Sequence, residues 1–410
     1  MLDPEWNFSD DGPTKFWEGN RAWLLRRGIN LYSLAQRDQS HEGKELFTHW
    51  CTPVRSCTPA GAPQLEGESL PWARCAEGPR REAFWLPSKY IAPARDPSGR
   101  DVILKVIDRH GVENTVSKAL LDAVDYTDPS TFPCIVPPLA VLDTPYHYSF
   151  LCMPRWGTVN WFYDIDTPRE FLRFAGCLLR ALEFLHSRRI AHRDIIPQNM
   201  LSDSYTLDSD KQLVVANIQE RRSQGDIDNI TALMDLGAAF VFPRGKPLAE
   251  CILLSSEAIG NRMFAPDDLE RGAPYHNPFS YDVGMLGNIL RYHFWHMASA
   301  VPSLAPLFDR MTTYVIHERF TAEEALRFFK DTTTQVSDEA LNTKFLTPET
   351  EARRISTGDV YWSRLSPQDQ EFWKRYRTPP EAWWIPLVRW LLQFHWPGTL
   401  FFSIRWWLKI

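Results

Sequence analysis

Residues 189–201 read Arg-Ile-Ala-His-Arg-Asp-Ile-Ile-Pro-Gln-Asn-Met-Leu. In this stretch His192, Arg193 and Asp194 are consecutive, and four residues separate Asp194 from Asn199. Taken alone, such a string is also compatible with a charged turn on the surface. The residues on either side of it therefore decide how it is interpreted.

Apolar segments flank this stretch on both sides. Residues 167–186 predict a helix, with Thr167 as the N-cap and Pro168 at the first helical position. Apolar residues recur there every three to four positions, at Phe171, Phe174, Leu178, Leu182 and Leu185. After the stretch, residues 199–201 begin a short apolar strand.

The spacing H-R-D-x-x-x-x-N, with these flanks, resembles the catalytic loop of the protein kinase superfamily. The resemblance implies that Asp194 is the catalytic base for the hydroxyl being phosphorylated and that Asn199 holds a magnesium ion. It implies an α+β fold with two lobes, a small β-rich N-lobe and a larger α-helical C-lobe. It also implies ATP and Mg²⁺ as cofactors.

Residues 89–96 and 101–107 predict two strands joined by a turn at Pro97-Ser-Gly-Arg. Lys105 lies inside the second strand, where an ammonium needs either a partner or a solvent-facing position. By resemblance, Lys105 is the lysine that contacts the α- and β-phosphates. Its expected partner is Glu113, on a predicted helix over 112–123; the alternative is that Glu113 only favours the helix dipole.

Two further segments resemble the nucleotide site of kinases. Residues 146–153 predict a strand that ends at Met153, and the following Pro154-Arg-Trp-Gly matches the hinge whose backbone contacts adenine. Ala232-Leu-Met-Asp-Leu-Gly resembles the D-F-G motif, with leucine in place of phenylalanine. Asp235 would then chelate magnesium, and Gly237 would permit a sharp turn.

Later motifs follow in the order that the resemblance requires. Residues 240–260 match an activation segment, with Ser255 and Ser256 as candidate phosphorylation sites. Phe264-Ala-Pro-Asp resembles A-P-E, and Arg319 matches the arginine that pairs with its carboxylate, here Asp267. Residues 281–287 resemble the buried helix whose aspartate, Asp282, caps the catalytic-loop backbone.

Two features depart from the family pattern. No G-x-G-x-x-G occurs before Lys105, which predicts weaker or differently shaped nucleotide binding. Ile196 stands where serine/threonine kinases usually carry a lysine that touches the γ-phosphate, so this position does not distinguish a Ser/Thr substrate from a Tyr substrate.

Residues 203–228 are strongly polar and predict an inserted surface loop.

Composition limits the class of protein. The chain has 410 residues, of which 44% are hydrophobic, so a sizeable core is expected. The net charge of −6 gives no reason to expect nucleic acid as a partner.

Seven scattered cysteines suit a reducing, intracellular and cytoplasmic location, and they lack the tight C-x-x-C pair expected of a zinc site. The first residues lack the apolar run of a signal peptide.

We expect three regions: an N-terminal extension over 1–82, a protein-kinase-like domain over 83–330 and a C-terminal extension over 331–410. The pattern of Trp, Arg and Gly in residues 16–34 resembles the lead-in of a kinase-like family found widely in fungi. Residues 383–410 are rich in Trp and carry scattered basic residues. Three alternatives remain for this tail: docking onto the kinase-like domain, peripheral membrane contact, or a partner surface.

The resemblance implies a protein kinase that transfers the ATP γ-phosphate to a protein substrate, at a Ser or Thr hydroxyl rather than a Tyr. The first alternative is a pseudokinase that serves as a scaffold or interaction protein with little or no turnover. The second is a small-molecule phosphotransferase. The sequence does not indicate the oligomeric state or the identity of the substrate.

Overall fold

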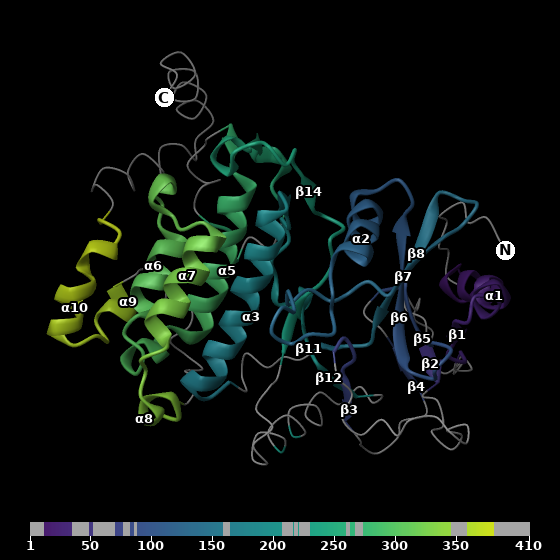
Figure 1. Cartoon of the computed structure of the whole chain (residues 1–410), viewed down its shortest axis with the longest axis horizontal. Coiled ribbons are helices and arrows are strands. Elements are labelled where there is room, and N and C mark those ends of the chain that lie inside the picture. The colour runs from purple at the N-terminus through teal and green to yellow at the C-terminus, as the bar shows by residue number, and fades with distance from the viewer. Residues whose placement is uncertain are drawn as a thin grey trace, which may run out of the picture. The chain divides into compact units, whose positions relative to one another are not determined.

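A five-stranded antiparallel sheet and a group of packed helices are the two main parts of this mixed α and β fold (Figure 1). The computed structural model describes residues 12–34, 49–51, 70–76, 83–85, 88–158, 165–206, 216, 220, 230–259, 263–266, 274–345 and 359–380. The backbone divides into a sheet unit, Met1–Ile165 with Pro197–Ala239, and a helical unit, Asp166–Ile196 with Phe240–Ile410.

The sheet has its strands in the spatial order β1 (Asn30–Leu31), β5 (Ile91–Arg95), β6 (Asp101–Asp108), β8 (Tyr148–Pro154) and β7 (Ala140–Asp143). Each strand runs antiparallel to its neighbours. The strands predicted over 89–96, 101–107 and 146–153 are confirmed with small shifts at their ends. The predicted turn between β5 and β6 is also present, and Gly99 supplies its positive φ of 81°.

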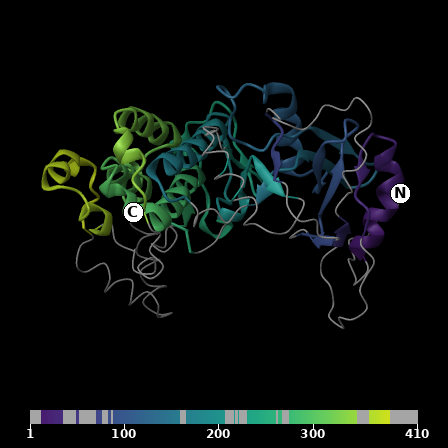
Figure 2. The same cartoon turned by 90° about the horizontal axis from the view of Figure 1, so that it is seen from below.

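Helix α1 (Gly12–Leu25) covers one face of this sheet (Figure 1, Figure 2). The ring of Phe16 lies 5.5 Å from that of Tyr148, and the ring of Trp17 lies 5.7 Å from that of Phe150. Trp17 is fully buried. Helix α1 therefore contributes to the core of the sheet unit.

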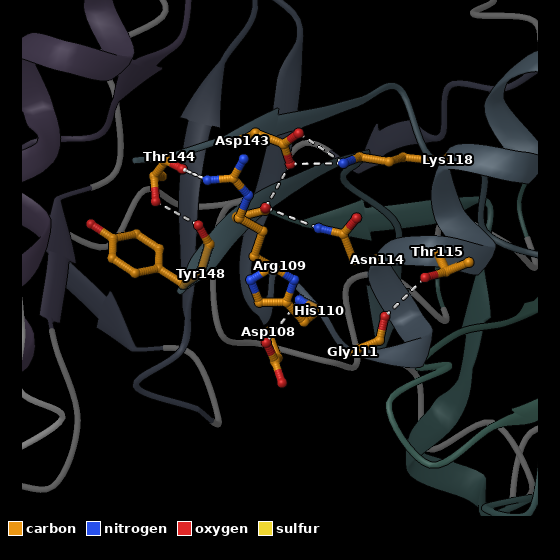
Figure 3. A network of polar contacts seen from close by, with 11 residues as sticks. Asp108, Arg109, His110, Gly111, Asn114, Thr115, Lys118, Asp143, Thr144 and Tyr148 are labelled. Carbon is orange, nitrogen blue, oxygen red and sulfur yellow. Dashed lines mark hydrogen bonds and ion pairs between the residues drawn. The ribbon is translucent and has the colours of Figure 1, made fainter. Parts of the chain in front are cut away.

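Helix α2 (Val112–Ala123), which has the bounds predicted from the sequence, lies on the other face. Figure 3 shows the polar contacts that fix it against β7 and β8. The Asn114 side chain donates to Ser149 Oγ at 2.9 Å, and Lys118 Nζ lies 2.8 Å from both carboxylate oxygens of Asp143. Because Ser149 and Phe150 are successive strand residues, their side chains point to opposite faces.

Smaller strand pairs complete the sheet unit. A three-stranded sheet has the order β13 (Thr231–Leu233), β11 (Met200–Ser202) and β9 (Gly157–Thr158). Strand β3 (Arg74–Ala76) pairs in parallel with β12 (Ser204–Thr206), and β2 (His49–Cys51) pairs with β4 (Ala83–Trp85). Most of the polar segment predicted as an inserted loop lies outside the described residues.

The helical unit is built around α3 (Pro168–Ser187), which packs beside α5 (Pro278–Phe294) and α7 (Ala322–Thr333). Helix α6 (Leu304–Thr312) contacts both α5 and α7. The prediction of an N-cap at Thr167 is confirmed, since Thr167 and Glu170 form a capping box. In the core, the ring of Phe171 lies 4.8 Å from that of Phe294.

Short elements connect and extend these helices. They are β10 (Ile190–Ala191), β14 (Phe240–Val241), β15 (Leu253–Leu254), β16 (Tyr275–His276), α8 (Asp338–Leu341), α9 (Asp359–Trp362) and α10 (Pro367–Trp373). The 3₁₀ helices are η2 (Pro197–Asn199), η3 (Leu248–Glu250), η4 (Ser255–Glu257), η5 (Trp295–Ser299), η6 (Ile316–Glu318) and η8 (Lys374–Tyr376).

Described residues that follow α7 pack against the helices of the same unit. Trp362 of α9 is buried, and its indole Nε1 donates to Asp309 Oδ2 of α6 at 2.6 Å. The Trp-rich segment 383–410 lies outside the described residues. Within the described ranges, no helix is both long and apolar enough to cross a membrane. The cysteines described there, Cys51, Cys134, Cys152, Cys177 and Cys251, form no disulfide.

Candidate functional site

Lys105 lies at the centre of a charged cluster in the sheet unit. Its Nζ is 2.8 Å from Glu113 Oε1 and 2.7 Å from Asp235 Oδ1. Strand β6 supplies the lysine, the first turn of α2 supplies the glutamate, and the segment after β13 supplies the aspartate. The predicted pairing of Lys105 with Glu113 is present, and Asp235 is a second partner of the same ammonium.

Burial and charge act against each other in this cluster. Burial lowers the pKa of Lys105, but the carboxylates of Glu113 and Asp235 outweigh it and raise that pKa above its ordinary value of 10.5. Burial raises the pKa of Glu113, and the Lys105 ammonium only partly offsets this. The ammonium is therefore charged at neutral pH, and the loss of either carboxylate partner would leave it less compensated.

Asn199 and Asp235 are brought together by the pairing of β11 with β13. Asn199 immediately precedes β11, and Met200 lies opposite Leu233 in the antiparallel register. The register continues one step further, because Met234 N–H donates to the Asn199 carbonyl at 2.9 Å. Two residues that are distant in sequence thus lie at the same end of one strand pair.

Gly237 leaves room for this charged cluster. Its backbone N–H donates to Asp235 Oδ1 at 3.0 Å. A Cβ atom at this position would lie 3.0 Å from Asp235 Oδ1 and 3.4 Å from Glu113 Oε2. Asp235 itself has a φ of 68°, a conformation that few residues other than glycine adopt. The predicted sharp turn at Asp-Leu-Gly is therefore present.

The polar groups at this end of the strand pair suit a hard cation. An amide oxygen from Asn199 and a carboxylate from Asp235 are ligands of the kind Mg²⁺ prefers. Among the residues with described positions, no group of three or more His, Cys, Asp and Glu could hold a metal ion. Since Mg²⁺ usually takes one or two carboxylates together with phosphate oxygens and water, this donor set fits it when the other ligands are phosphates.

Met153 lies on the same side of the sheet as Lys105. It is in β8, directly opposite Ile103 of β6, and Ile103 and Lys105 share one face because they are two residues apart. The predicted hinge follows it. There Arg155 N–H donates to the Asp101 carbonyl at 3.1 Å, and Trp156 Nε1 donates to the Pro71 carbonyl at 2.9 Å.

Asp194 lies in the helical unit, on a loop held by Asp282 of α5. Asp282 accepts hydrogen bonds from the backbone N–H groups of His192 and Arg193, both at 2.7 Å. The ring of His186 approaches the same carboxylate, with Nε2 3.1 Å from Asp282 Oδ2. The prediction that Asp282 caps this loop is confirmed, whereas the contact of His186 with Asp282 was not predicted.

The sequence-predicted residues divide between the two units. Lys105, Glu113, Met153, Asn199 and Asp235 belong to the sheet unit, and Asp194 belongs to the helical unit, because the loop passes from one to the other after Ile196. The sequence feature that could have identified His186 is its position, since it is a histidine in the last turn of the predicted helix α3.

Arg319 is buried in the helical unit, and carbonyl oxygens surround its guanidinium. Its Nε and one terminal nitrogen donate to the Thr313 carbonyl at 3.1 and 2.6 Å, and its other terminal nitrogen donates to the Ser280 carbonyl at 3.2 Å. Asp267, the carboxylate predicted to pair with Arg319, lies outside the described residues. Thr321, two residues after Arg319, is the N-cap of α7, and its side chain accepts a hydrogen bond from Glu324 N–H.

No model of a known protein family matches the chain, and no curated protein matches it either. A proposal for the function therefore has to rest on the sequence motifs and on the geometry around Lys105.

Proposed function

We propose that the chain is a two-lobed, protein-kinase-like phosphotransferase that transfers the γ-phosphate of ATP, with Mg²⁺, to a hydroxyl of a protein. The observation that carries this proposal is the double ion pair of Lys105, 2.8 Å from Glu113 and 2.7 Å from Asp235. A lysine held between a helix glutamate and the aspartate of an Asp-Leu-Gly motif is the arrangement that kinases use to position phosphates.

Each residue of the sheet unit has a distinct role in this proposal. Lys105 holds the α- and β-phosphates through its charge, and Glu113 fixes the direction of its ammonium. Asn199 and Asp235 hold magnesium at the end of the β11–β13 pair, and Met153 lies next to the segment that receives the adenine. Bound ATP and Mg²⁺ supply the phosphoryl group and neutralise its charge, so the protein contributes mainly positioning and electrostatic stabilisation.

Asp194 is the base in this proposal. Its carboxylate would accept the proton of the substrate hydroxyl while that oxygen bonds to the γ-phosphorus, the bond from this phosphorus to the bridging oxygen breaks, and ADP leaves. Asp282 supports this step by fixing the backbone of the two preceding residues, His192 and Arg193. Arg193 has a φ of 70°, so the loop needs such a restraint to keep its conformation.

Thermal unfolding with and without millimolar magnesium-ATP tests the proposal. A ligand at about 100 times its dissociation constant stabilises the folded state by about 2.7 kcal/mol, which raises the melting temperature by a few degrees. We expect such a shift for the wild type and for Asp125→Ala, an exposed carboxylate in the same unit, and its loss in Asp235→Ala. A shift that does not need magnesium, or that survives Asp235→Ala, would contradict the metal assignment.

A pseudokinase is the second candidate, favoured by the β5–β6 turn and the sequence before it. Gly99 is the only glycine between Arg81 and Lys105, so the backbone lacks the glycines that allow close approach to phosphates. Ile196 further removes the lysine expected near the γ-phosphate. A chain that magnesium-ATP stabilises but that transfers no phosphate to any protein mixture would identify this alternative.

A further inference from the structure

Residues 154–157, here called the hinge segment, carry two large polar side chains that are buried in the sheet unit. Arg155 is 7% exposed and Trp156 is 5% exposed. A guanidinium and an indole N–H that leave water need hydrogen-bond or aromatic partners inside the protein. The groups that receive these two side chains therefore determine where the hinge segment lies.

Trp156 is held by a carbonyl from the N-terminal extension. Its indole Nε1 donates to the Pro71 carbonyl at 2.9 Å, and the two residues are 85 positions apart. Its ring stacks on that of Phe132, with the ring centres 6.0 Å apart and the planes 19° from parallel. The segment that carries Pro71 leads into β3, which pairs with β12. The indole is therefore fixed at its N–H by one segment and on its ring by another.

Arg155 lies against two tyrosines that share one carboxylate. The central carbon of its guanidinium is 5.3 Å from the ring centre of Tyr205 and 6.0 Å from that of Tyr32. The hydroxyls of Tyr32 and Tyr205 donate to Asp101 at 2.5 and 2.9 Å. The backbone carbonyl of Asp101 accepts the N–H of Arg155 at 3.1 Å. Asp101 thus holds the backbone of the hinge segment and also the two rings beside its arginine.

The buried carboxylate of Asp101 has a third donor, Arg95 Nε, at 3.1 Å. Burial raises the pKa of the Tyr32 hydroxyl above its ordinary value of 10.0, so this hydroxyl is protonated at neutral pH and donates to Asp101. A buried network with several donors on one carboxylate restrains each of its members. Because Tyr32 directly follows β1, the N-terminal extension is attached to the hinge segment at a second place.

We infer that Tyr32 and Trp156 are positioning residues for the adenine, and that the N-terminal extension thereby forms part of the nucleotide site. This inference rests on the proposed function and deepens it. In the proposal, the hinge segment contacts the base, and the contacts to Pro71 and Asp101 hold that segment in place. The phosphates are held elsewhere, at the charged cluster around Lys105. Loss of the hinge contacts should therefore weaken binding of the base and leave binding of the phosphates unchanged.

Two ligands separate these effects: magnesium-ATP, and magnesium tripolyphosphate, which has no base. Isothermal titration calorimetry of the full chain measures both dissociation constants. Trp156→Phe and Tyr32→Phe each keep an aromatic ring and lose one hydrogen-bond donor. We expect each variant to bind magnesium-ATP at least about fivefold more weakly than the wild type, and magnesium tripolyphosphate within about twofold of it.

Trp17→Phe and Tyr148→Phe are matched controls in the same unit. Trp17 Nε1 donates to the Lys89 carbonyl and the Tyr148 hydroxyl donates to Asn20 Oδ1, both at 3.2 Å, so each control loses the same kind of bond outside the hinge segment. Both controls should bind the two ligands as the wild type does. Urea unfolding shows whether each variant is folded. Tyr32→Phe removes a single oxygen atom and decides the test if Trp156→Phe does not fold.

A purely structural role of these contacts predicts a different result. Equal weakening of the two ligands in the hinge variants, unchanged magnesium-ATP binding in them, or the same selective loss in the controls would overturn the inference. So would equal affinity of the wild type for the two ligands, since the base would then contribute nothing. In all of these cases the phosphate site of the proposed function would stand. A wild-type chain that binds neither ligand would contradict the proposed function and this inference with it.

Discussion

The carboxylate of Asp282 accepts a hydrogen bond from the backbone N–H of Arg193 at 2.7 Å, and a second one comes from His192 at the same distance. Asp282 is fully buried, and Arg193 has a φ of 70°. One buried side chain thus satisfies two backbone donors in a strained loop. The conformation of the residues before Asp194 depends on it.

Replacement of Asp282 by alanine should lower the free energy of unfolding by about 3 kcal/mol, because two hydrogen bonds to a charged group are lost and buried donors remain. Urea unfolding measures this change. Asp282→Asn retains one acceptor oxygen and should cost less. Equal stability of Asp282→Ala and wild type would show that solvent or other groups satisfy these donors.

Replacement of Asp194 by asparagine tests the proposed base. This variant should lose phosphate transfer while its stabilisation by magnesium-ATP stays near that of the wild type, because Lys105, Asn199 and Asp235 are unchanged. A transfer assay and a melting curve on the same preparation measure both effects. Transfer at the wild-type rate would show that the catalytic-base assignment is wrong.

Local patterns in the sequence predicted much of the secondary structure. Helix α2 was predicted over 112–123 and has those bounds, and α3 has the predicted N-cap at Thr167. These elements depend on apolar periodicity and capping, which act over a few residues. The Asp282 cap is different, because it joins residues 89 and 90 positions apart and was predicted from the resemblance to kinases rather than from a local pattern.

Contacts between distant segments were not predictable in this way. Asp101 is buried and accepts hydrogen bonds from the hydroxyls of Tyr32 at 2.5 Å and Tyr205 at 2.9 Å, residues 69 and 104 positions away. No local pattern indicates such pairing. Similarly, Asp235 appeared in the sequence as a metal ligand, but its ion pair with Lys105 spans 130 positions and depends on the β11–β13 pairing.

Trp17 tests whether α1 is part of the sheet core. It is fully buried, and its indole Nε1 donates to the Lys89 carbonyl at 3.2 Å. Trp17→Ala should therefore lower the free energy of unfolding by about 3–5 kcal/mol. Leu25→Ala, at a side chain 56% exposed on the same helix, should change it by less than about 0.5 kcal/mol. Similar urea midpoints for Trp17→Ala and wild type would mean that α1 adds little to the core.

Gly157 tests the close approach of β9 to β12. A Cβ atom here would lie 1.9 Å from the carbonyl oxygen of Ser204, so the backbone must move to accept alanine. Gly157→Ala should lower the free energy of unfolding by about 1–3 kcal/mol or more. Gly245→Ala is the matched control, because a Cβ there meets nothing within 4 Å. Equal effects of the two substitutions on denaturant unfolding would contradict this packing.

Asp309 accepts hydrogen bonds from Trp362 and Thr378 of the 359–380 segment, and its carboxyl should make the free energy of unfolding depend on pH. Burial raises the pKa of Asp309 above its ordinary value of 3.8, although hydrogen bonds from Thr378 and Trp362 and the charge of Arg310 oppose this. The folded chain therefore retains a proton that the unfolded chain releases. As the pH falls through the raised pKa towards 3.8, the contribution of Asp309 to stability increases.

Asp309→Asn removes this titration. The free energy of unfolding of the wild type, minus that of the variant, should therefore become more positive as the pH falls from about 7 to about 4. Asp125 predicts the opposite sign, because hydrogen bonds from Thr127 lower its pKa and its contribution is lost on acidification. Urea unfolding of wild type, Asp309→Asn and Asp125→Asn from about pH 7 to about pH 3 measures both trends, because the contribution of Asp125 is lost as the pH falls through its ordinary pKa of 3.8 towards its lowered one. A difference between wild type and Asp309→Asn that does not change with pH would mean that the Asp309 carboxyl titrates in the folded chain as it does in the unfolded one.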